Sequence, residues 1–279
     1  MTDALPVFIP LHLKDRDVLP HCLRGLRHLR PRPSRVTVVS AELPAALARE
    51  IARLGAGWLH EEQVRADAGL PRWPTLRLGG DDRSGWMLQQ AIKWEATRYH
   101  DAPRHLVIDA DTVLVRPTEV VSGGRDVLFA RPGCHRPYLD CYARLLGEAA
   151  PTDRSFITHF MVLRRDVLEA LTGAIRARAA GSWMDAVLSA IDPAEGSPFS
   201  EYETYGHFAT THFPDAVVVR PNENKGARFY LRSVRLQLAL ARALGAGSLS
   251  FHGYQRDATR RAALARLSGD VRMLLGRRW

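Results

Sequence analysis

The sequence predicts an α/β fold in which helices flank a mixed, mostly parallel sheet. Residues 7–13 and 35–40 contain short apolar runs typical of strands, the first strand ending near Pro10, and residues 18–29 between them carry apolar side chains at helical spacing. A strand, a helix and a strand within about forty residues form a βαβ unit, which places both strands parallel in one sheet. A third apolar run, residues 106–108, is typical of a central strand buried on both faces.

The remaining elements continue this alternation. A second helix is expected over residues 43–54, with Gly55 at its end, and a short strand over 57–60. Residues 61–82 mix prolines, glycines and charges without a sustained period, so we expect a long loop there. A helix over residues 85–99 then leads into the central strand. Further along, we expect helices at 138–146, 165–178, 183–191 and 231–244, and strands at 126–130, 156–163, 216–219 and 248–251.

The length of 279 residues suits a single large domain, and the sequence contains no evident linker, internal repeat or low-complexity tract. We therefore assign residues 1–255 to one domain. Residues 256–279 place apolar side chains on one stripe and many arginines elsewhere, which predicts an amphipathic basic helix. This helix either packs on the domain with a solvated basic face or contacts an anionic membrane surface.

The composition of the sequence indicates the broad class of the protein and its expected location in the cell. The hydrophobic fraction of 46% and the charged fraction of 25% are ordinary for a soluble globular chain. No apolar run approaches the roughly 20 residues that span a bilayer, and the N-terminus lacks the pattern of a secretory signal. The cysteines Cys22, Cys134 and Cys141 show no Cys-X-X-Cys spacing, which favours a reducing compartment and argues against zinc. We expect a cytoplasmic protein, with peripheral contact at the inner face of the membrane as the alternative.

The net charge of +9 comes mainly from arginine. Basic proteins attract polyanions, anionic membranes and phosphorylated small molecules. The arginines are scattered and do not alternate with aromatic residues in one tract, so we favour a nucleotide over a nucleic acid as partner. Coding bias of the source is an equally simple origin for an arginine-rich surface.

Two carboxylates, Asp109 and Asp111, follow the central strand directly. In an extended segment both would point the same way, from the edge of the sheet where open α/β proteins bind ligands. Two close carboxylates repel each other unless a proton or a cation lies between them. Paired oxygen ligands suit Mg²⁺ or Mn²⁺, which also bind phosphate oxygens. We therefore expect a metal–diphosphate site, the alternative being a strand followed by an Asp-containing turn.

Three common nucleotide and hydrolase motifs are absent from the sequence. There is no Gly-X-Gly-X-X-Gly after a strand, no Gly-X-X-X-X-Gly-Lys-Ser/Thr and no Gly-X-Ser-X-Gly. Dinucleotide dehydrogenases, P-loop enzymes and α/β-hydrolases therefore become poor matches.

The ordered set of motifs resembles GT-A glycosyltransferases, and within them a largely uncharacterised bacterial family of GT-A-like proteins with an Asp-X-Asp motif. Its marks are Ile9-Pro10, Val38-Val39-Ser40, Gly85-Trp86 with Gln89-Gln90 and Lys93, residues 109–117, residues 155–159 and residues 199–206. The resemblance covers residues 5–222 and does not specify a substrate. It implies a GT-A-like, Rossmann-like fold that transfers a sugar from a nucleotide-sugar donor, with a UDP-sugar favoured, to a glycan or small-molecule acceptor.

The resemblance also implies roles in metal and donor binding. Asp111 would be a direct ligand of Mn²⁺ or Mg²⁺, and Asp109 would contact the metal, the donor ribose or both. GT-A enzymes often add a C-terminal histidine, for which His252 is the candidate, because Mn²⁺ accepts imidazole beside carboxylates. The alternative for His252 is a hydrogen-bonded loop histidine. The remaining candidates for donor contacts are Ile9, Pro10, Lys14, Gln89 and Lys93, with a solvated surface as the alternative for Gln89 and Lys93.

Residues 199–206 are the second candidate stretch, because they combine carboxylates with tyrosines. Aromatic faces suit sugar rings, and carboxylates accept hydrogen bonds from hydroxyls. An inverting transferase needs a general base, and an extended segment would direct both Glu201 and Glu203 at one acceptor. His159 is the rival base, a structural turn is the non-functional alternative, and a retaining enzyme needs no such base.

Two other functions fit parts of the pattern. Asp109 after an apolar strand also resembles the nucleophile motif of haloacid-dehalogenase-like phosphatases, although that motif normally opens its domain. A non-catalytic nucleotide or polyanion binder is the third possibility, for which salt would weaken binding steeply.

Overall fold

The computed structural model describes residues 5–70, 75–227 and 233–252. Its central five-stranded sheet has the order β13-β7-β1-β3-β4, in which only β13 is antiparallel to its neighbour. The five strands are β1 (Leu5–Pro10), β3 (Pro33–Ser40), β4 (Ala56–His60), β7 (Arg104–Ile108) and β13 (Phe160–Arg164). The predicted mixed, mostly parallel sheet is therefore confirmed.

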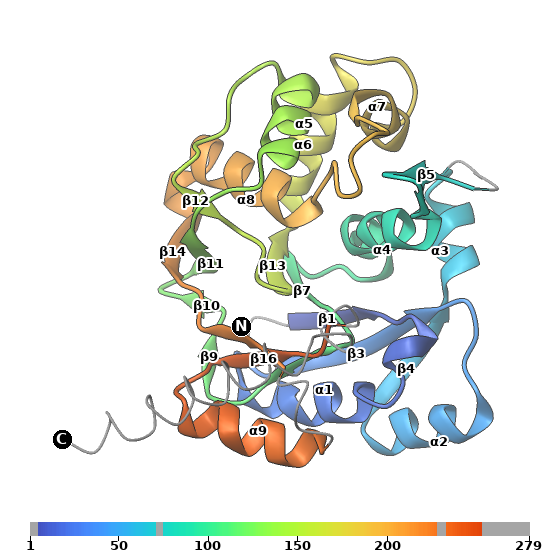
Figure 1. The fold of residues 1–279 in the computed structure, drawn as a ribbon, viewed down its shortest axis with the longest axis vertical. Coiled ribbons are helices and arrows are strands. Elements are labelled where there is room, and N and C mark those ends of the chain that lie inside the picture. The colour runs from blue at the N-terminus through green and yellow to red at the C-terminus, as the bar shows by residue number, and fades with distance from the viewer. Residues whose placement is uncertain (1–4, 71–74, 228–232, 253–279) are drawn as a thin grey trace.

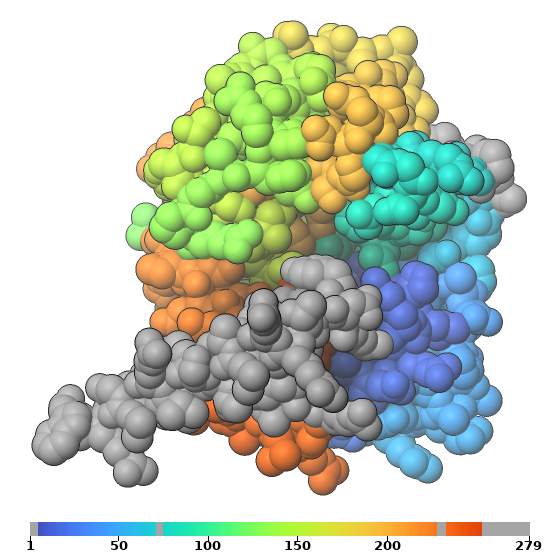
Figure 2. Space-filling view, in the orientation of Figure 1, coloured from blue at the N-terminus to red at the C-terminus, as the bar shows by residue number. Residues whose placement is uncertain are grey.

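Helices cover both faces of this sheet (Figure 1). On one side lie α1 (Leu19–Gly25), α2 (Ala45–Arg53) and α9 (Val234–Ala243). On the other lie α3 (Glu61–Asp67), α4 (Ser84–Glu95), α5 (Arg136–Leu146), α6 (Arg165–Arg176), α7 (Trp183–Ala190) and α8 (Glu201–His212). Figure 2 shows the two layers from outside, with the green and yellow residues of α5–α7 at the top and the blue residues of the first βαβ unit at the lower right.

Side-chain alternation along the strands produces two hydrophobic clusters. In β1, Phe8 joins the cluster that includes Met87 and Ile92 of α4, whereas Val7 and Ile9 join the cluster that includes α1. Burial of both faces explains why the central strands read as continuous apolar runs.

Smaller sheets extend the core. Strand β11 (Arg125–Pro132) pairs with β10 (Val121–Ser122), β12 (Arg154–Ser155) and β14 (Val217–Pro221). Strand β16 (Ser248–Ser250) lies between β8 (Thr112–Leu114) and β15 (Asn224–Gly226). The two-stranded pairs are β2 (Leu29–Arg30) with β9 (Thr118–Glu119), and β5 (Arg77–Leu78) with β6 (Asp81–Asp82).

Three local expectations are wrong. Residues 61–82 are not one long loop, because α3 begins after His60, whose Nδ1 accepts a hydrogen bond from the Glu62 amide, and β5 pairs with β6. The strand expected from residue 156 begins at Phe160. Residues 199–206 are not extended, because Ser200 caps α8 by accepting a hydrogen bond from the Glu203 amide.

The basic segment 256–279 lies outside the described residues, so the domain division and its membrane contact stay predictions. Within the described ranges, no helix combines the length and the apolar character needed to cross a membrane.

Two packed histidines predict a loss of stability in acid. His105 is fully buried on β7, donates from Nε2 to the Lys93 carbonyl at 3.0 Å, and packs 5.0 Å from the His100 ring. Burial lowers the pKa of His105 to about 3 and that of His100 to about 4. Both stay neutral in the folded state while the unfolded chain takes up protons below pH 6.5, so stability falls as the pH drops from 6.5 towards 4.

We expect each histidine to contribute up to about 1.4 kcal/mol per pH unit in that window. Urea denaturation of the wild type and of His105→Gln between pH 7 and pH 4 measures the effect, because glutamine keeps a side-chain donor but does not titrate. Equal slopes for the two proteins would contradict the prediction.

Candidate active site

A cavity of about 510 Å³ opens where β1 and β7 end, and it contains most of the predicted site residues. Pro10 and Lys14 line it from the end of β1, and Gln89 and Lys93 line it from α4. Asp109 and Asp111 follow β7 in a turn, in which the Thr112 amide donates to the Asp109 carbonyl at 2.9 Å. The two carboxylates therefore share the cavity through a turn and not, as expected, through an extended segment.

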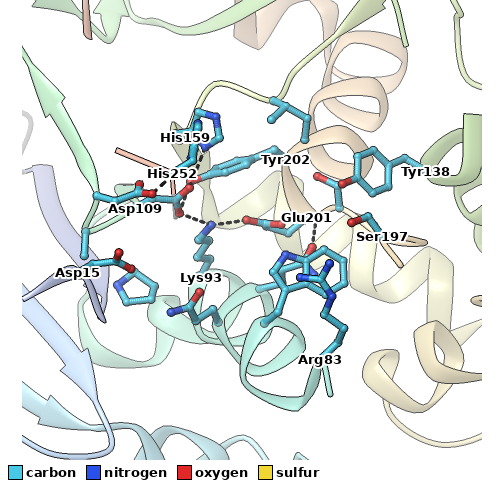
Figure 3. Close-up of a pocket in the computed structure, with 18 of the residues that line it drawn as sticks. Asp15, Arg83, Lys93, Asp109, Tyr138, His159, Ser197, Glu201, Tyr202 and His252 are labelled. Atoms are coloured by element: carbon cyan, nitrogen blue, oxygen red, sulfur yellow. Dashed lines mark hydrogen bonds and ion pairs between the residues drawn. The ribbon is translucent and has the colours of Figure 1, made fainter. Parts of the chain in front are cut away.

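Lys93 occupies the centre of the cavity as a buried cation (Figure 3). Its Nζ lies 2.6 Å from Asp109 Oδ1, 2.5 Å from Glu201 Oε1 and 4.2 Å from the centre of the Tyr202 ring. Burial alone would lower the pKa of Lys93, but the two carboxylates hold it well above its usual value. Lys93 therefore stays charged and joins α4, the Asp109 turn and α8.

Neighbouring side chains engage both carboxylate oxygens of Asp109. Oδ1 contacts Lys93 and accepts a hydrogen bond from Tyr202 Oη at 3.3 Å, and Oδ2 lies 3.1 Å from Nδ1 of His159. Burial would raise the pKa of Asp109, but Lys93 and His159 hold it well below its usual value. Asp109 is thus a permanent anion fixed in one orientation.

His159 has a strained backbone that its surroundings stabilise. Its φ of +65° is unusual for a residue with a side chain. The Asp109 amide donates to the His159 carbonyl at 2.9 Å, and the Asp109 carboxylate accepts from Nδ1. Pairing of β13 with β7 places the two residues side by side, because Phe160 is opposite Ile108. Strain of this kind is common where a side chain must be presented to a ligand.

His252 reaches the cavity through pairing of strands far apart in sequence. Strands β16 and β8 are antiparallel, and the Phe251 amide donates to the Asp111 carbonyl at 2.9 Å. This pairing puts His252 Nδ1 3.4 Å from Asp111 Oδ2 and its ring 4.5 Å from that of His159.

Two predicted site residues lie elsewhere. Ile9 is fully buried beneath the sheet, because side chains alternate along β1 and only Pro10 reaches the cavity. Glu203 is 1% exposed and accepts hydrogen bonds from Ser155 Oγ at 2.5 Å and the Phe156 amide at 2.9 Å. Residues two apart on a helix point in nearly opposite directions, so α8 directs Glu201 into the cavity and Glu203 into the core.

The cavity has further lining residues for which the sequence pattern predicted no individual role. These are Asp15, Arg83, Trp86, Gln90, Ala110, Tyr138, Ile157, Ser197, Ser200 and Tyr202. A usable signal existed on α4, where Trp86, Gln90 and Lys93 recur every three or four positions and so share one face, with Arg83 directly before the helix.

The donor atoms fit a divalent cation at one edge of the cavity. Among the described residues, no group of three or more His, Cys, Asp or Glu side chains is arranged to hold a metal ion by itself. Asp111 and His252 nevertheless present a carboxylate and an imidazole to the same point, and Mn²⁺ accepts both. Asp109 fits less well, because Lys93 and His159 already engage its oxygens.

The fold and the cavity define an α/β protein in which a carboxylate-lined cavity lies at the carboxyl end of a mostly parallel sheet. The chain belongs to the family of unknown function DUF6492, whose family model matches residues 78–236. No curated protein matches the sequence.

Solved structures similar to this one include glycosyltransferases. Galactosyltransferase LgtC in complex with donor and acceptor sugar analogues is 12% identical, with a TM-score of 0.48 over 98% of this chain and 96% of that one. Mouse xyloside xylosyltransferase 1 is 11% identical, with a TM-score of 0.41 over 91% and 99%. Glucosyl-3-phosphoglycerate synthase from Mycobacterium tuberculosis, in complex with Mn²⁺, UDP and glucosyl-3-phosphoglycerate, is 13% identical, with a TM-score of 0.39 over 78% and 69%.

Proposed function

We propose that this protein is a metal-dependent glycosyltransferase that moves a sugar from a nucleotide-sugar donor, with a UDP-sugar favoured, to a glycan or small-molecule acceptor. The observation that carries the proposal is the convergence of Asp111, His252 and the Asp109–His159 pair in one cavity at the end of β1 and β7. The ordered sequence motifs that resemble GT-A enzymes support the same conclusion.

The metal and the donor diphosphate are assigned to the edge of the cavity formed by Asp111 and His252. These two side chains would hold Mn²⁺ or Mg²⁺, which when bound offsets the negative charge that develops on the leaving diphosphate. Pro10 and Lys14 line the same cavity from the end of β1 and would contact the nucleotide. Lys93 acts as a counter-ion between Asp109 and Glu201, since its charge is already taken up by those carboxylates.

His159 is the better general base if the enzyme inverts the configuration of the sugar. Asp109 accepts from Nδ1 and so leaves Nε2 to accept a proton from the acceptor hydroxyl. Nε2 makes no hydrogen bond to any residue in the described part of the chain. Glu201 is less suitable, because Oε1 is bound to Lys93, and Glu203 is excluded from this role by its position in the core.

We expect calorimetric titration with UDP to show binding that requires Mn²⁺ and disappears when EDTA is present. We expect the requirement for metal because Asp111 and His252 would hold the cation, whose charge would offset the repulsion between the protein carboxylate and the diphosphate. GDP and TDP are the next ligands to titrate if UDP fails. If UDP, GDP and TDP all fail to bind in the presence of Mn²⁺ and of Mg²⁺, the proposed function is contradicted.

Two controls address the alternative functions. Hydrolysis of p-nitrophenyl phosphate that requires Asp109 would favour a phosphatase, although the engagement of both Asp109 oxygens does not suit nucleophilic attack. Nucleotide binding that ignores the metal but weakens steeply with salt would favour a polyanion binder.

A further inference from the structure

Two hydrogen-bond donors among the residues that line the cavity have no acceptor in the described part of the chain. Arg83 Nε and Gln90 Nε2 are buried, and neither has a hydrogen-bond partner in the described part of the chain. Both side chains line the cavity, Arg83 from the residue before α4 and Gln90 from within the helix. Buried donors without acceptors are costly and rare in folded proteins, so their presence in a cavity indicates a ligand that supplies acceptor atoms.

A hydrogen bond to its side-chain oxygen fixes the orientation of Gln90. Its Oε1 accepts a hydrogen bond from the Glu201 amide at 3.1 Å, and the residue is 3% exposed. The NH₂ group of the Gln90 side chain is therefore held in a fixed position, and no acceptor among the described residues meets it. This side chain is a preorganised donor.

Arg83 adds a positive charge that no carboxylate neutralises within the described ranges. Its guanidinium lies over the Trp86 ring, with Cζ 5.7 Å from the ring centre. The positive charge of Lys93, in contrast, is shared between two carboxylates. Arg83, the residue before α4, is thus left to pair with an anion. A guanidinium binds carboxylate and phosphate groups through two parallel hydrogen bonds.

This end of the cavity is separate from the proposed metal edge. Figure 3 shows Asp15, Asp109 and His252 at one side, Lys93 and Glu201 in the middle, and Arg83, Tyr138 and Ser197 at the other. A second cavity of about 420 Å³ lies next to the first, because Tyr138, Ile157 and Ser197 line both. The two neighbouring cavities together offer room for an acceptor longer than one sugar ring.

We propose that Arg83 and Gln90 form an oxyanion-binding subsite for the acceptor, which therefore carries a carboxylate or a phosphate group. The assignment to the acceptor rests on the proposed glycosyl transfer, whereas binding of the oxyanion does not. Trp86 and Tyr138 provide aromatic faces on the same side, which suit the ring of an acidic or phosphorylated sugar.

Three probes test the subsite by calorimetry on the full chain, with and without UDP and Mn²⁺. They are methyl β-D-glucuronide as the carboxylate, glucose 6-phosphate as the phosphate and methyl β-D-glucoside as the uncharged sugar. We expect at least one charged probe to bind about tenfold or more tighter than the uncharged one, because a hydrogen bond to a charged group is worth about one decade of affinity. The stronger of the two charged probes identifies the oxyanion.

Matched variants show which residues cause the preference for the charged probe. Arg83→Gln should abolish the preference for the charged probe and Gln90→Met should reduce it, whereas Arg77→Gln, an exposed arginine nearby on β5, should leave it unchanged. Arg83→Lys keeps the charge and should retain part of the preference, which guards against a folding defect in the glutamine variant. Circular dichroism melting curves confirm that each variant is folded.

Equal affinity for charged and uncharged probes, failure of both charged probes to bind, or a preference that survives in Arg83→Gln overturns the subsite. The two proposals fail separately. Metal-dependent UDP binding without any oxyanion preference removes only the subsite, and oxyanion preference without nucleotide binding removes only the transferase.

Discussion

Replacement of Asp111 by asparagine is expected to reduce Mn²⁺-dependent glycosyl transfer by about a thousandfold or more, because loss of a group that stabilises the charged leaving group has effects of that size. The amide keeps an oxygen for the hydrogen bond from Thr112 Oγ1, found at 3.2 Å, but lacks the charge that attracts the cation. The measurement is release of UDP from the UDP-sugar that the wild type hydrolyses fastest, which needs no knowledge of the acceptor.

A matched Asp→Asn control separates the site from general effects of charge. Asp140 lies on α5 in a surface ion pair with Arg136 at 2.9 Å, so Asp140→Asn should keep full activity. His252→Gln should fall between the two variants, since it removes the imidazole but no formal charge. Near-full activity of Asp111→Asn in a folded protein would remove the metal assignment.

Replacement of Lys93 by methionine is expected to lower the free energy of unfolding by about 3–5 kcal/mol, because it leaves buried carboxylates without their cation. The Lys93 and Glu201 side chains are 6% and 5% exposed, so water compensates little, whereas Asp109 at 27% retains more solvent. Methionine preserves most of the volume of the lysine stem, so the loss reports mainly on charge. Guanidinium denaturation followed by tryptophan fluorescence measures it.

Two comparisons make the Lys93 result specific. Arg136→Met breaks an exposed ion pair and should cost about 1 kcal/mol or less. The double variant Lys93→Met with Glu201→Gln should recover part of the lost stability, because one of the two unpaired charges is then gone. A loss no larger than that of Arg136→Met would show that the Lys93 cluster does not contribute as a buried network.

Local patterns in the sequence were sufficient to predict the central strands and several of the helices that cover them. Apolar runs predicted β1, β3 and β7, and helical spacing predicted α1, α2 and α4, because each pattern reflects burial within a single element. The same reasoning placed Asp109 and Asp111 at the carboxyl end of a central strand, where the cavity is found.

The directions in which the two glutamates point depend on whether their segment forms a helix or a strand. Glu201 and Glu203 would face one acceptor from an extended segment, but α8 turns them to opposite sides. The sequence contained a signal for this helix, since Ser200 and Glu203 have the spacing of an N-terminal capping box. The alternate spacing of the two glutamates suggested an extended segment instead, and the tyrosines beside them suggested sugar contacts.

The sequence alone determined the α/β class, the central strand and the position of the Asp109–Asp111 motif along the chain. Only the tertiary structure decided which partners these carboxylates meet, namely Lys93 and His159 for Asp109, and His252 for Asp111. The physical reason is that periodicity records which face of an element is buried. It carries no information on the register of β16 against β8, or on the packing of α8 beside α4, which bring residues more than a hundred positions apart into contact.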